Sequence, residues 1–307
     1  MMNVVPLLAI ALLAQDAPKV RVTVSVDWEG RDLRETKLKA AERLREALPD
    51  VPLTHFLNAA YFTKEKADAT KVAESIRRAV RKGDETGLHI HAWRSLVEAS
   101  RVDFRRGPTF WGWDVEGVGE VGHEVELEAY TVDELKKIVA KSRAILKGAG
   151  FEITPSFRAA GWVAGPKVLE AIRAEGFRVD SSATDASWHD ELERYPLRRR
   201  IREIWPKVTS ESAPFAIDTP AGAVVEMPDT GALADYVTGE EMLAHLRDAV
   251  KRLGDRDVYV HIGFHQETAD AYASRVTEAV RAIRKESGDK VVFETLETAA
   301  KRTGLLK

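Results

Sequence analysis

The sequence predicts an α/β protein built as a distorted parallel (β/α) barrel of about seven or eight strands, similar to a TIM barrel. Two observations point to this fold. Short runs rich in β-branched and aromatic residues alternate along the chain with longer amphipathic segments, which is the order of strand and helix in a βα repeat. A length of 307 residues, of which 44% are hydrophobic and 31% charged, suits one large globular domain. Alternation alone does not distinguish a closed barrel from an open sheet.

The strands are predicted from period-2 alternation and from the turn residues that bound each run. Residues 20–30 form the clearest example, because apolar and polar side chains alternate up to the turn residue Gly30. This alternation places Asp27 and Glu29 on the same face of the strand's C-terminal end. The other predicted strands are 53–58, 87–93, 153–158, 177–181, 223–227, 258–264 and 290–293.

The helices are predicted from the helical spacing of apolar residues and from capping residues at their ends. Thr131 with Glu134, and Thr238 with Glu241, stand in capping-box register at the start of amphipathic segments. The predicted helices are 35–48, a charged helix within 64–82, 131–147, 166–176, a helix from Gly239 and 268–286.

Two long stretches, 98–130 and 186–220, do not fit the repeat and are predicted as loops. The first is rich in glycine and follows a predicted strand into the region where barrel enzymes build their sites. Its Trp111 and Trp113 either stack on sugar rings or fasten the loop to the barrel. The second contains the basic run 198–202, which we interpret as a solvated loop rather than a phosphate site.

Charge and cysteine content exclude several classes of function. The net charge is −3 and no broad basic region exists, so a nucleic-acid partner is not expected. The chain has no cysteine, which excludes disulfides, thiolate nucleophiles and cysteine-held metals. A metal ion would therefore need histidine and carboxylate ligands.

The N-terminus has the features of a targeting segment. The apolar run 4–14 is too short to span a bilayer and is followed by a polar turn. We interpret residues 1–14 as a signal peptide, which predicts a secreted or periplasmic protein without a transmembrane span. A buried N-terminal segment is the alternative, because the usual positive charge at the start is missing. Residues 15–307 are expected to form a single catalytic domain, since nothing marks a boundary within them.

The stretch 87–93 carries two histidines, His89 and His91, separated by one residue. On a β-strand both imidazoles leave the same face, where two neutral nitrogens can bind one metal ion. The alternative is a pair of histidines that are hydrogen-bonded inside a core. A further histidine, His123, is interpreted as a surface residue more readily than as an extra ligand.

Polar side chains gather at the predicted C-terminal ends of the strands. In a parallel barrel these ends face the same way, so residues far apart in the sequence meet in one basin. Together they supply the groups of a metal-assisted hydrolase: ligands that leave a position for water, a carboxylate base and a late histidine as acid. The residues are Asp27, Glu29, His89, His91, Arg158, Asp180, Glu226, His261 and His265.

Six short motifs, taken in order, resemble those of the polysaccharide deacetylases of carbohydrate esterase family 4. The resemblance covers about residues 20–300. It implies a distorted parallel β/α barrel and a hydrolase that removes acetyl groups from an N-acetylated or O-acetylated glycan. It also implies a divalent metal, and histidine and carboxylate ligands favour Zn²⁺. The motifs are residues 24–30, 53–57, 85–91, 156–162, 179–182 and 263–265.

The resemblance also implies roles for particular residues. Asp27 matches the catalytic base of the family, and Arg158 matches the arginine that orients this base. His265 matches the histidine that protonates the leaving group, although His261 on the same strand face is an alternative. Asp180 matches an aspartate that supports these groups from behind.

The chain departs from the family pattern in two of the motifs. Trp28 stands where the family has a metal-binding aspartate, so Glu29, on the same strand face as Asp27, is the candidate ligand. The roles of Asp27 and Glu29 could also be exchanged. Trp93 stands where the family has its second metal-binding histidine, and His91 is the available substitute. The metal site is therefore expected to be shifted, or else lost.

Three tryptophans, Trp93, Trp111 and Trp162, are expected to contact the substrate, with Trp162 in the pocket wall. Two other functions are compatible with the sequence. Some relatives of this fold lack the metal and cleave small cyclic or linear amides, which predicts activity that survives chelators. The other is a glycan-binding protein without activity, which the joint presence of base, orienting arginine and acid argues against.

Overall fold

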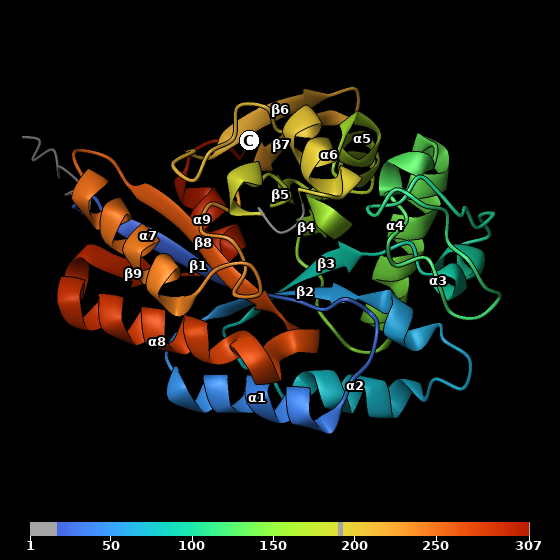
Figure 1. The fold of residues 1–307 in the computed structure, drawn as a ribbon, viewed down its shortest axis with the longest axis horizontal. Coiled ribbons are helices and arrows are strands. Elements are labelled where there is room, and N and C mark those ends of the chain that lie inside the picture. Colours follow the sequence, from blue (N-terminus) through green and yellow to red (C-terminus); the bar gives the residue numbers. More distant parts are fainter. Residues whose placement is uncertain (1–16, 190–192, 307) are drawn as a thin grey trace, which may run out of the picture.

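The computed structural model of the chain describes residues 17–189 and 193–306 (Figure 1). The predicted signal peptide, residues 1–14, lies outside the described residues. Within the described ranges, no helix is both long enough and apolar enough to cross a membrane.

The described strands form one nine-stranded sheet with the order β6-β7-β5-β4-β3-β2-β1-β8, and β9 also pairs with β1. Every pair is parallel except β6 with β7. The sheet curls through the middle of the molecule (Figure 1), but none of the pairings between described residues joins β6 to β8. The predicted distorted parallel barrel is therefore confirmed, and it is open on one side. The strands are β1 Val20–Asp27, β2 Leu53–Asn58, β3 Glu85–Ile90, β4 Ser156–Ala159, β5 Val179–Asp180, β6 Phe215–Thr219, β7 Gly222–Glu226, β8 Val258–His265 and β9 Val291–Phe293.

Helices connect most of the parallel strands, and in Figure 1 α1, α2 and α8 lie along the lower side of the molecule while α5 and α6 lie along its upper side. Both predicted capping boxes are present, at Thr131 with Glu134 and at Thr238 with Glu241. Two short helices, α3 and α9, were not predicted, because six or seven residues are too few for a clear helical period. The helices are α1 Glu35–Ala47, α2 Ala69–Arg77, α3 Arg94–Ala99, α4 Val132–Gly148, α5 Pro166–Ala174, α6 Pro196–Ile204, α7 Gly239–Arg252, α8 Ala269–Ser287 and α9 Leu296–Arg302.

The stretch 186–220 is not the continuous loop that was predicted. It contains α6 and β6, and β6 forms an antiparallel hairpin with β7. Helix α6 begins with Pro196 at its first position and buries Leu197 and Ile201. The prolines therefore mark the ends of short elements, and the basic run 198–202 lies on a helix rather than in a solvated loop.

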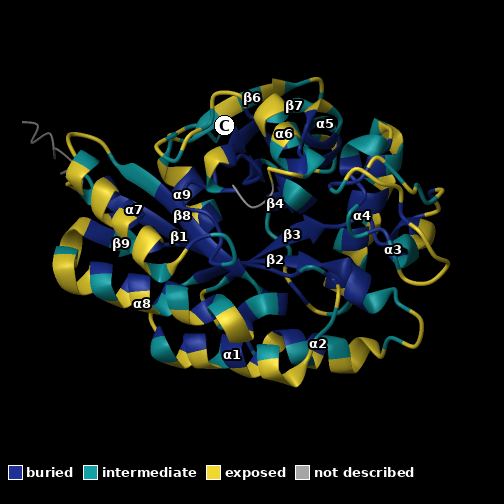
Figure 2. Cartoon of the chain, viewed as in Figure 1, coloured by how far each residue is buried: buried dark blue, intermediate teal, exposed yellow. Residues whose placement is uncertain are grey.

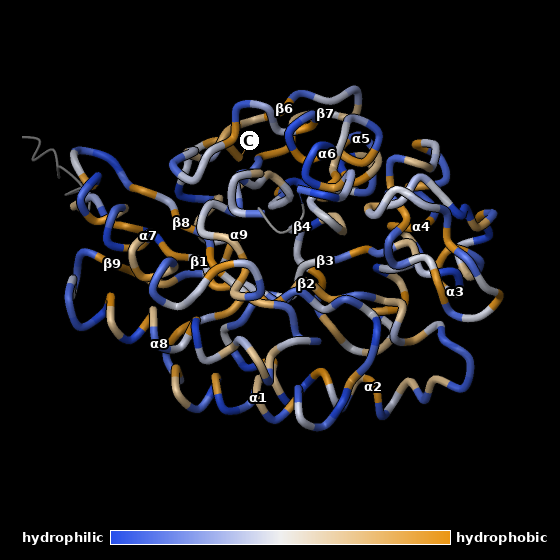
Figure 3. Tube along the Cα trace, in the orientation of Figure 1, coloured by the Kyte–Doolittle hydropathy of each residue, from blue (hydrophilic) through white to orange (hydrophobic). Residues whose placement is uncertain are grey.

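Parallel pairing aligns the C-terminal ends of the strands. Asp27 at the end of β1 is in register with His265 on β8, and His89 on β3 is in register with Arg158 on β4. Figure 2 shows that most strands are buried, with β6 partly exposed, while the outward faces of the helices are exposed. Figure 3 shows the matching alternation of hydropathy along the helices. Polar residues at buried strand ends are thus held together by the fold.

Candidate active site

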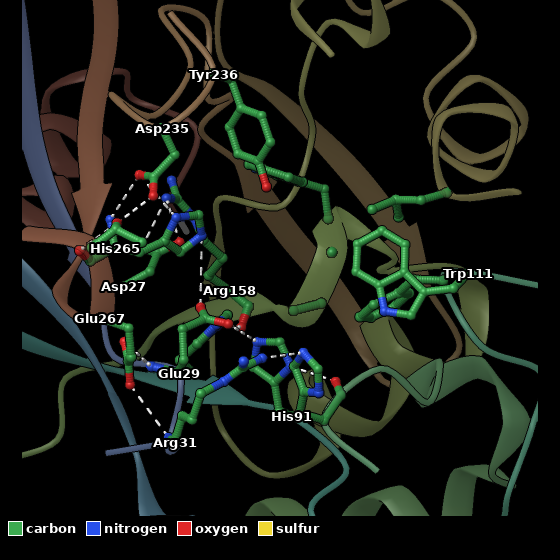
Figure 4. A pocket seen from close by; sticks show the side chains of 18 of the residues that line it. Asp27, Glu29, Arg31, His91, Trp111, Arg158, Asp235, Tyr236, His265 and Glu267 are labelled. Atoms are coloured by element: carbon green, nitrogen blue, oxygen red, sulfur yellow. Dashed lines mark hydrogen bonds and ion pairs between the residues drawn. The ribbon is translucent and has the colours of Figure 1, made fainter. Parts of the chain in front are cut away.

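A pocket of about 390 Å³ opens at the C-terminal ends of β1, β3, β4 and β8. Figure 4 shows Trp111 across this pocket from Asp27, Glu29 and His265. Polar groups therefore face an aromatic wall. The lining residues include the polar Asp27, Glu29, His89, His91, Arg158 and His265 and the aromatic Phe110, Trp111, Trp162 and Tyr236. Most of the strand-end residues predicted to share a basin do so.

Glu29, His89 and His91 form a compact set of possible metal ligands, with one ligand atom from each within 4.8 Å of the others. One carboxylate oxygen of Glu29 lies 3.2 Å from Nε2 of His89, and the other lies 2.8 Å from Nε2 of His91. Burial opposes ionisation of Glu29, but the neighbouring imidazoles outweigh it and hold the pKa of this carboxyl well below its usual value. The carboxyl of Glu29 is therefore ionised at neutral pH.

In both histidines Nδ1, the ring nitrogen that does not contact Glu29, donates a hydrogen bond to a backbone carbonyl. Nδ1 of His89 donates to the carbonyl of Arg158 at 2.8 Å, and Nδ1 of His91 donates to the carbonyl of His123 at 2.5 Å. This arrangement turns the Nε2 lone pair of each neutral ring toward the carboxylate of Glu29, where lone pairs and carboxylate repel unless a cation or proton lies between them. A set of two nitrogens and a carboxylate, each oriented by a second group, fits a divalent metal such as Zn²⁺.

The backbone of Glu29 is held at both ends by side chains. Its N–H donates to the carboxylate of Glu267 at 3.2 Å, and its carbonyl accepts from the indole of Trp93 at 2.8 Å and from Asn58 at 3.2 Å. Gly30 follows with φ +80°, and a Cβ there would lie 2.9 Å from the Trp93 indole nitrogen. The turn that carries Glu29 therefore requires a glycine and is fixed by three separate elements.

This frame explains how the chain differs from the family pattern. Strand alternation sends Trp28 to the core side of β1, where its indole donates to Nδ1 of His55 at 3.2 Å. Glu29 returns to the pocket side. Trp93, predicted to contact substrate, is buried, is not among the residues lining the pocket, and instead positions Glu29. Trp28 and Trp93, the two residues that differ from the family pattern, are thus both related to the position of the Glu29 carboxylate.

Replacing Trp93 by phenylalanine is expected to weaken metal binding about tenfold, because the Glu29 carbonyl loses its indole donor and the carboxylate becomes less well oriented. Zinc titration of the two proteins would measure this. Trp188→Phe is a matched control, since Trp188 also donates its indole N–H to a carbonyl, that of Thr230, at 2.9 Å. Equal zinc affinity in the Trp93→Phe and Trp188→Phe proteins would contradict the positioning role.

Asp27 and Arg158 form a buried ion pair beside the ligand set. Nη1 of Arg158 lies 3.1 Å and 3.2 Å from the two carboxylate oxygens of Asp27. Nη1 also donates to the hydroxyl of Ser25 at 3.1 Å, while Nε and Nη2 donate to the carbonyl and the hydroxyl of Ser181 at 2.8 Å and 2.9 Å. Burial opposes the charge on Arg158, yet Asp27 outweighs it and raises the pKa of the guanidinium. The orientation of Asp27 is therefore set by a fully occupied arginine.

His265 faces the same pocket and is held by Asp235, a residue that the sequence did not indicate. Nδ1 of His265 lies 3.0 Å from the carboxylate of Asp235, and Nε2 lies 3.7 Å from Glu29. Burial lowers the pKa of His265, but Asp235 and Glu29 outweigh it and raise this pKa to about 10. The imidazole is thus a charged proton donor at neutral pH.

Replacing Asp235 by asparagine is expected to lower the pKa of His265 from about 10 toward its ordinary value of 6.5. The raised pKa means that the ion pair stabilises the fold fully below about pH 6.5 and that this contribution is lost as pH rises through about 10. NMR titration of the metal-free proteins would report the pKa, and denaturant unfolding from pH 6 to pH 10 would report the stability. An unchanged His265 pKa in Asp235→Asn would contradict the pairing.

Three other predicted residues lie behind the pocket rather than in its lining. His261 is buried beside Arg158, 3.1 Å from Nη2, and burial and this cation hold the pKa of its ring well below the usual value. Asp180 is in register with Glu226 on β7. Burial and the charge of Asp180 raise the pKa of Glu226 well above its usual value. Asp180 is thus buried and lies outside the pocket lining, while its supporting role stays a prediction.

Two buried acids were not predicted: Asp229, which contacts the lining residue Trp162, and Glu267, which itself lines the pocket. Trp162 lines the pocket as expected, and its indole donates at 3.0 Å to Asp229, whose pKa burial raises to about 6. Glu267 accepts a hydrogen bond from Tyr61, and its pKa is raised to about 7 by burial and by Glu29. Neither acid follows a recognisable motif, so only spatial proximity identifies them.

His123, interpreted from sequence as a surface residue, belongs to the pocket lining. Its ring stacks on His91 and on Trp93 at centroid distances of 5.7 Å and 5.3 Å, and Nε2 lies 2.6 Å from the guanidinium of Arg31. It is not part of the compact ligand set found among the described residues. Its contribution is the carbonyl that orients His91.

The fold and the pocket together define a class: a curled parallel β/α barrel with an acid and histidine site at its strand ends. No protein family model and no curated protein matches the chain by sequence. Solved structures do match. A protein from Mycobacterium smegmatis assigned to the polysaccharide deacetylases has a TM-score of 0.59 and 16% identity over 95% of this chain and 93% of that one.

A second protein assigned to the polysaccharide deacetylases, from Pseudomonas aeruginosa PAO1, has a TM-score of 0.54 and 16% identity over 94% of this chain and 93% of that one. The Puue allantoinase has a TM-score of 0.55 and 14% identity over 94% of this chain and 92% of that one. The chain therefore has the polysaccharide deacetylase fold, as the ordered motifs predicted.

Proposed function

We propose that the protein is a metal-dependent hydrolase that removes acetyl groups from an N-acetylated or O-acetylated glycan. The observation that carries this proposal is the ligand set Glu29, His89 and His91 in one pocket with Asp27 and His265. The fold shared with proteins assigned to the polysaccharide deacetylases supports the same reaction class. We also propose, from the sequence of residues 1–14, that the protein is secreted or periplasmic.

Glu29, His89 and His91 would hold the metal, which we infer to be Zn²⁺ from the nitrogen and oxygen donors. When bound, such an ion polarises a carbonyl and lowers the pKa of water toward about 7. The remaining chemistry belongs to the chain. Asp27, oriented by Arg158, accepts the proton of the attacking water, and Nε2 of His265 donates a proton to the departing amine or alcohol.

The aromatic wall suits a sugar as the substrate. Trp111 faces Asp27, Glu29 and His265 across the pocket, and Phe110, Trp162 and Tyr236 also line it. A pyranose has an apolar C–H face that packs against aromatic rings, while its acetyl group can reach the polar side. We therefore propose that the scissile bond binds between Asp27 and His265 and that the sugar ring packs against Trp111.

A metal-independent amidase acting on a small amide is the second candidate. The observation that favours it is the TM-score of 0.55 with an allantoinase, which is close to the scores with the proteins assigned to the polysaccharide deacetylases. The two candidates differ in one respect that is readily measured. The deacetylase requires the metal, whereas the amidase retains activity after chelation.

Acetate release from N-acetylglucosamine oligomers and from acetylated xylo-oligosaccharides tests the proposal. We expect acetate from at least one of these series, loss of release after chelation, and recovery when zinc is added back. Release that survives complete metal removal would favour the amidase. The absence of acetate from both series in the zinc-loaded protein would leave a glycan-binding protein without activity as the better account.

A further inference from the structure

We propose that His55 is a positioning residue for the metal site: it fixes Trp28 on the core side of β1 and thereby sets the direction of the Glu29 carboxylate. The inference rests on the proposed function for the role of Glu29 as a metal ligand. The observation itself is a buried series of hydrogen bonds that runs from Asp84 through His55 to Trp28 and ends one residue before Glu29.

His55 and Trp28 lie together on the side of the sheet that faces away from the pocket. Parallel pairing places His55 of β2 in register with Val26 of β1, and Trp28 follows two residues later, so the three side chains point the same way. The N–H of Trp28 still donates to the carbonyl of Phe56 at 3.0 Å, which continues the strand pairing. Both His55 and Trp28 are 0% exposed, whereas the next residue, Glu29, lines the pocket.

The hydrogen bonds of His55 define which of its ring nitrogens carries the proton. The indole N–H of Trp28 donates to Nδ1 at 3.2 Å, so the neutral ring must be protonated at Nε2. Nε2 then donates to a carboxylate oxygen of Asp84 at 3.3 Å. Burial lowers the pKa of His55 although Asp84 opposes this, which keeps the ring neutral, as the arrangement requires. The indole therefore has one defined acceptor.

Asp84 anchors the other end of the series. Its side chain is 1% exposed, and its carboxylate also accepts from Nη2 of Arg45 at 2.9 Å and from the backbone N–H groups of Leu53 at 2.9 Å and Arg81 at 2.7 Å. Burial opposes ionisation of Asp84, but the hydrogen bonds from His55 and the backbone outweigh it and lower the pKa of this carboxyl. The series thus starts from an ionised group that is tied to α1, to β2 and to the turn before β3.

Trp28 passes this constraint to Glu29 in two ways. The two residues share a planar peptide unit, and the N–H of that unit donates to Glu267 at 3.2 Å. The indole also packs edge-to-face on Tyr61 at a centroid distance of 6.4 Å, and the hydroxyl of Tyr61 donates to the same carboxylate of Glu267. A shift of the indole would therefore disturb both contacts of Glu267 and move the Glu29 carboxylate relative to the two histidine ligands.

Zinc titration of His55→Leu tests the inference. Leucine cannot accept the indole N–H, and a buried donor without an acceptor favours a different position of the Trp28 ring, so we expect zinc affinity to fall about tenfold. His55→Asn should recover most of this loss, because its amide oxygen can take the place of Nδ1 as the acceptor. Trp28→Phe keeps a ring but lacks the donor and should lose a similar amount, which tests the same hydrogen bond if His55→Leu does not fold.

A second buried histidine provides the matched control. His245 is 7% exposed and lies outside the hydrogen-bonded series, so His245→Leu removes a buried imidazole without touching Trp28 and should bind zinc as the parent protein does. Thermal unfolding of the metal-free proteins shows whether each variant is folded at the temperature of the titration. Equal zinc affinity in the folded His55→Leu and His245→Leu proteins would overturn the positioning role.

A double-mutant cycle separates positioning from a general loss of stability. If His55 acts through Trp28, the losses of zinc affinity in His55→Leu and Trp28→Phe should not add. The double variant should then bind zinc about tenfold more weakly than the parent protein, rather than about a hundredfold. Losses that add would overturn the proposed route through the indole.

Acetate release from the same proteins distinguishes this inference from the proposed reaction. Zinc binding that depends on His55, without acetate release from the parent protein, would support the positioning role and overturn the proposed reaction. Zinc-dependent acetate release together with unchanged zinc affinity in His55→Leu would do the reverse. A parent protein that binds no zinc would overturn both.

Discussion

Replacing His89 or His91 by alanine is expected to remove the metal and to lower acetate release about 10³-fold. Each imidazole supplies one of the three donors, and two remaining donors leave too few ligands for tight binding. The loss of the ion removes several kcal/mol of stabilisation from the developing negative charge, which corresponds to about three orders of magnitude in rate. Elemental analysis of the purified proteins, beside the acetate assay, measures both effects.

A buried histidine elsewhere provides the control for this experiment. His245 on α7 is buried, lies outside the ligand set, and contacts Trp188 edge-to-face. His245→Ala therefore removes an imidazole of similar burial and should retain about one zinc per chain. The proposal fails if the parent protein binds no metal in excess zinc, or if His89→Ala and His91→Ala retain as much zinc as His245→Ala does.

Replacing Asp27 by asparagine is expected to lower kcat about 10³-fold while leaving the metal in place. The amide is nearly the same size as the carboxylate and can still contact Arg158, but it cannot accept the proton of the attacking water. Removing the charge also leaves Arg158 without its main partner, so some loss of stability is expected. Acetate release, zinc content and the midpoint of thermal unfolding should be measured on the same sample.

Two further variants make the result for Asp27 specific. Asp229 is also buried near Arg158, at 3.9 Å, so Asp229→Asn controls for the loss of a neighbouring charge and should cost less activity. Glu29→Gln tests the assignment of roles within the first motif. Retained zinc in Glu29→Gln together with lost zinc in Asp27→Asn would reverse the roles of the two carboxylates.

Local patterns in the sequence determined the repeat of strands and helices. Alternation in residues 20–30 and the capping boxes at Thr131 and Thr238 are short-range features, so they predicted elements that the structure contains. The same alternation placed Asp27 and Glu29 on the pocket side, and parallel pairing brought His89 and Arg158 into register. This part of the site was predictable because strand direction alone brings the ends together.

Only the tertiary structure decided how these groups are held. The carboxylate of Asp235 on His265, that of Glu267 on the Glu29 backbone, and the indole of Trp93 on the same residue each join segments that are between 30 and 238 residues apart. These contacts leave no periodic trace along the chain, because a hydrogen bond between distant segments depends on their three-dimensional packing rather than on the residues beside them. The helix at 196–204 was also not predicted, because the prolines around it indicated a loop.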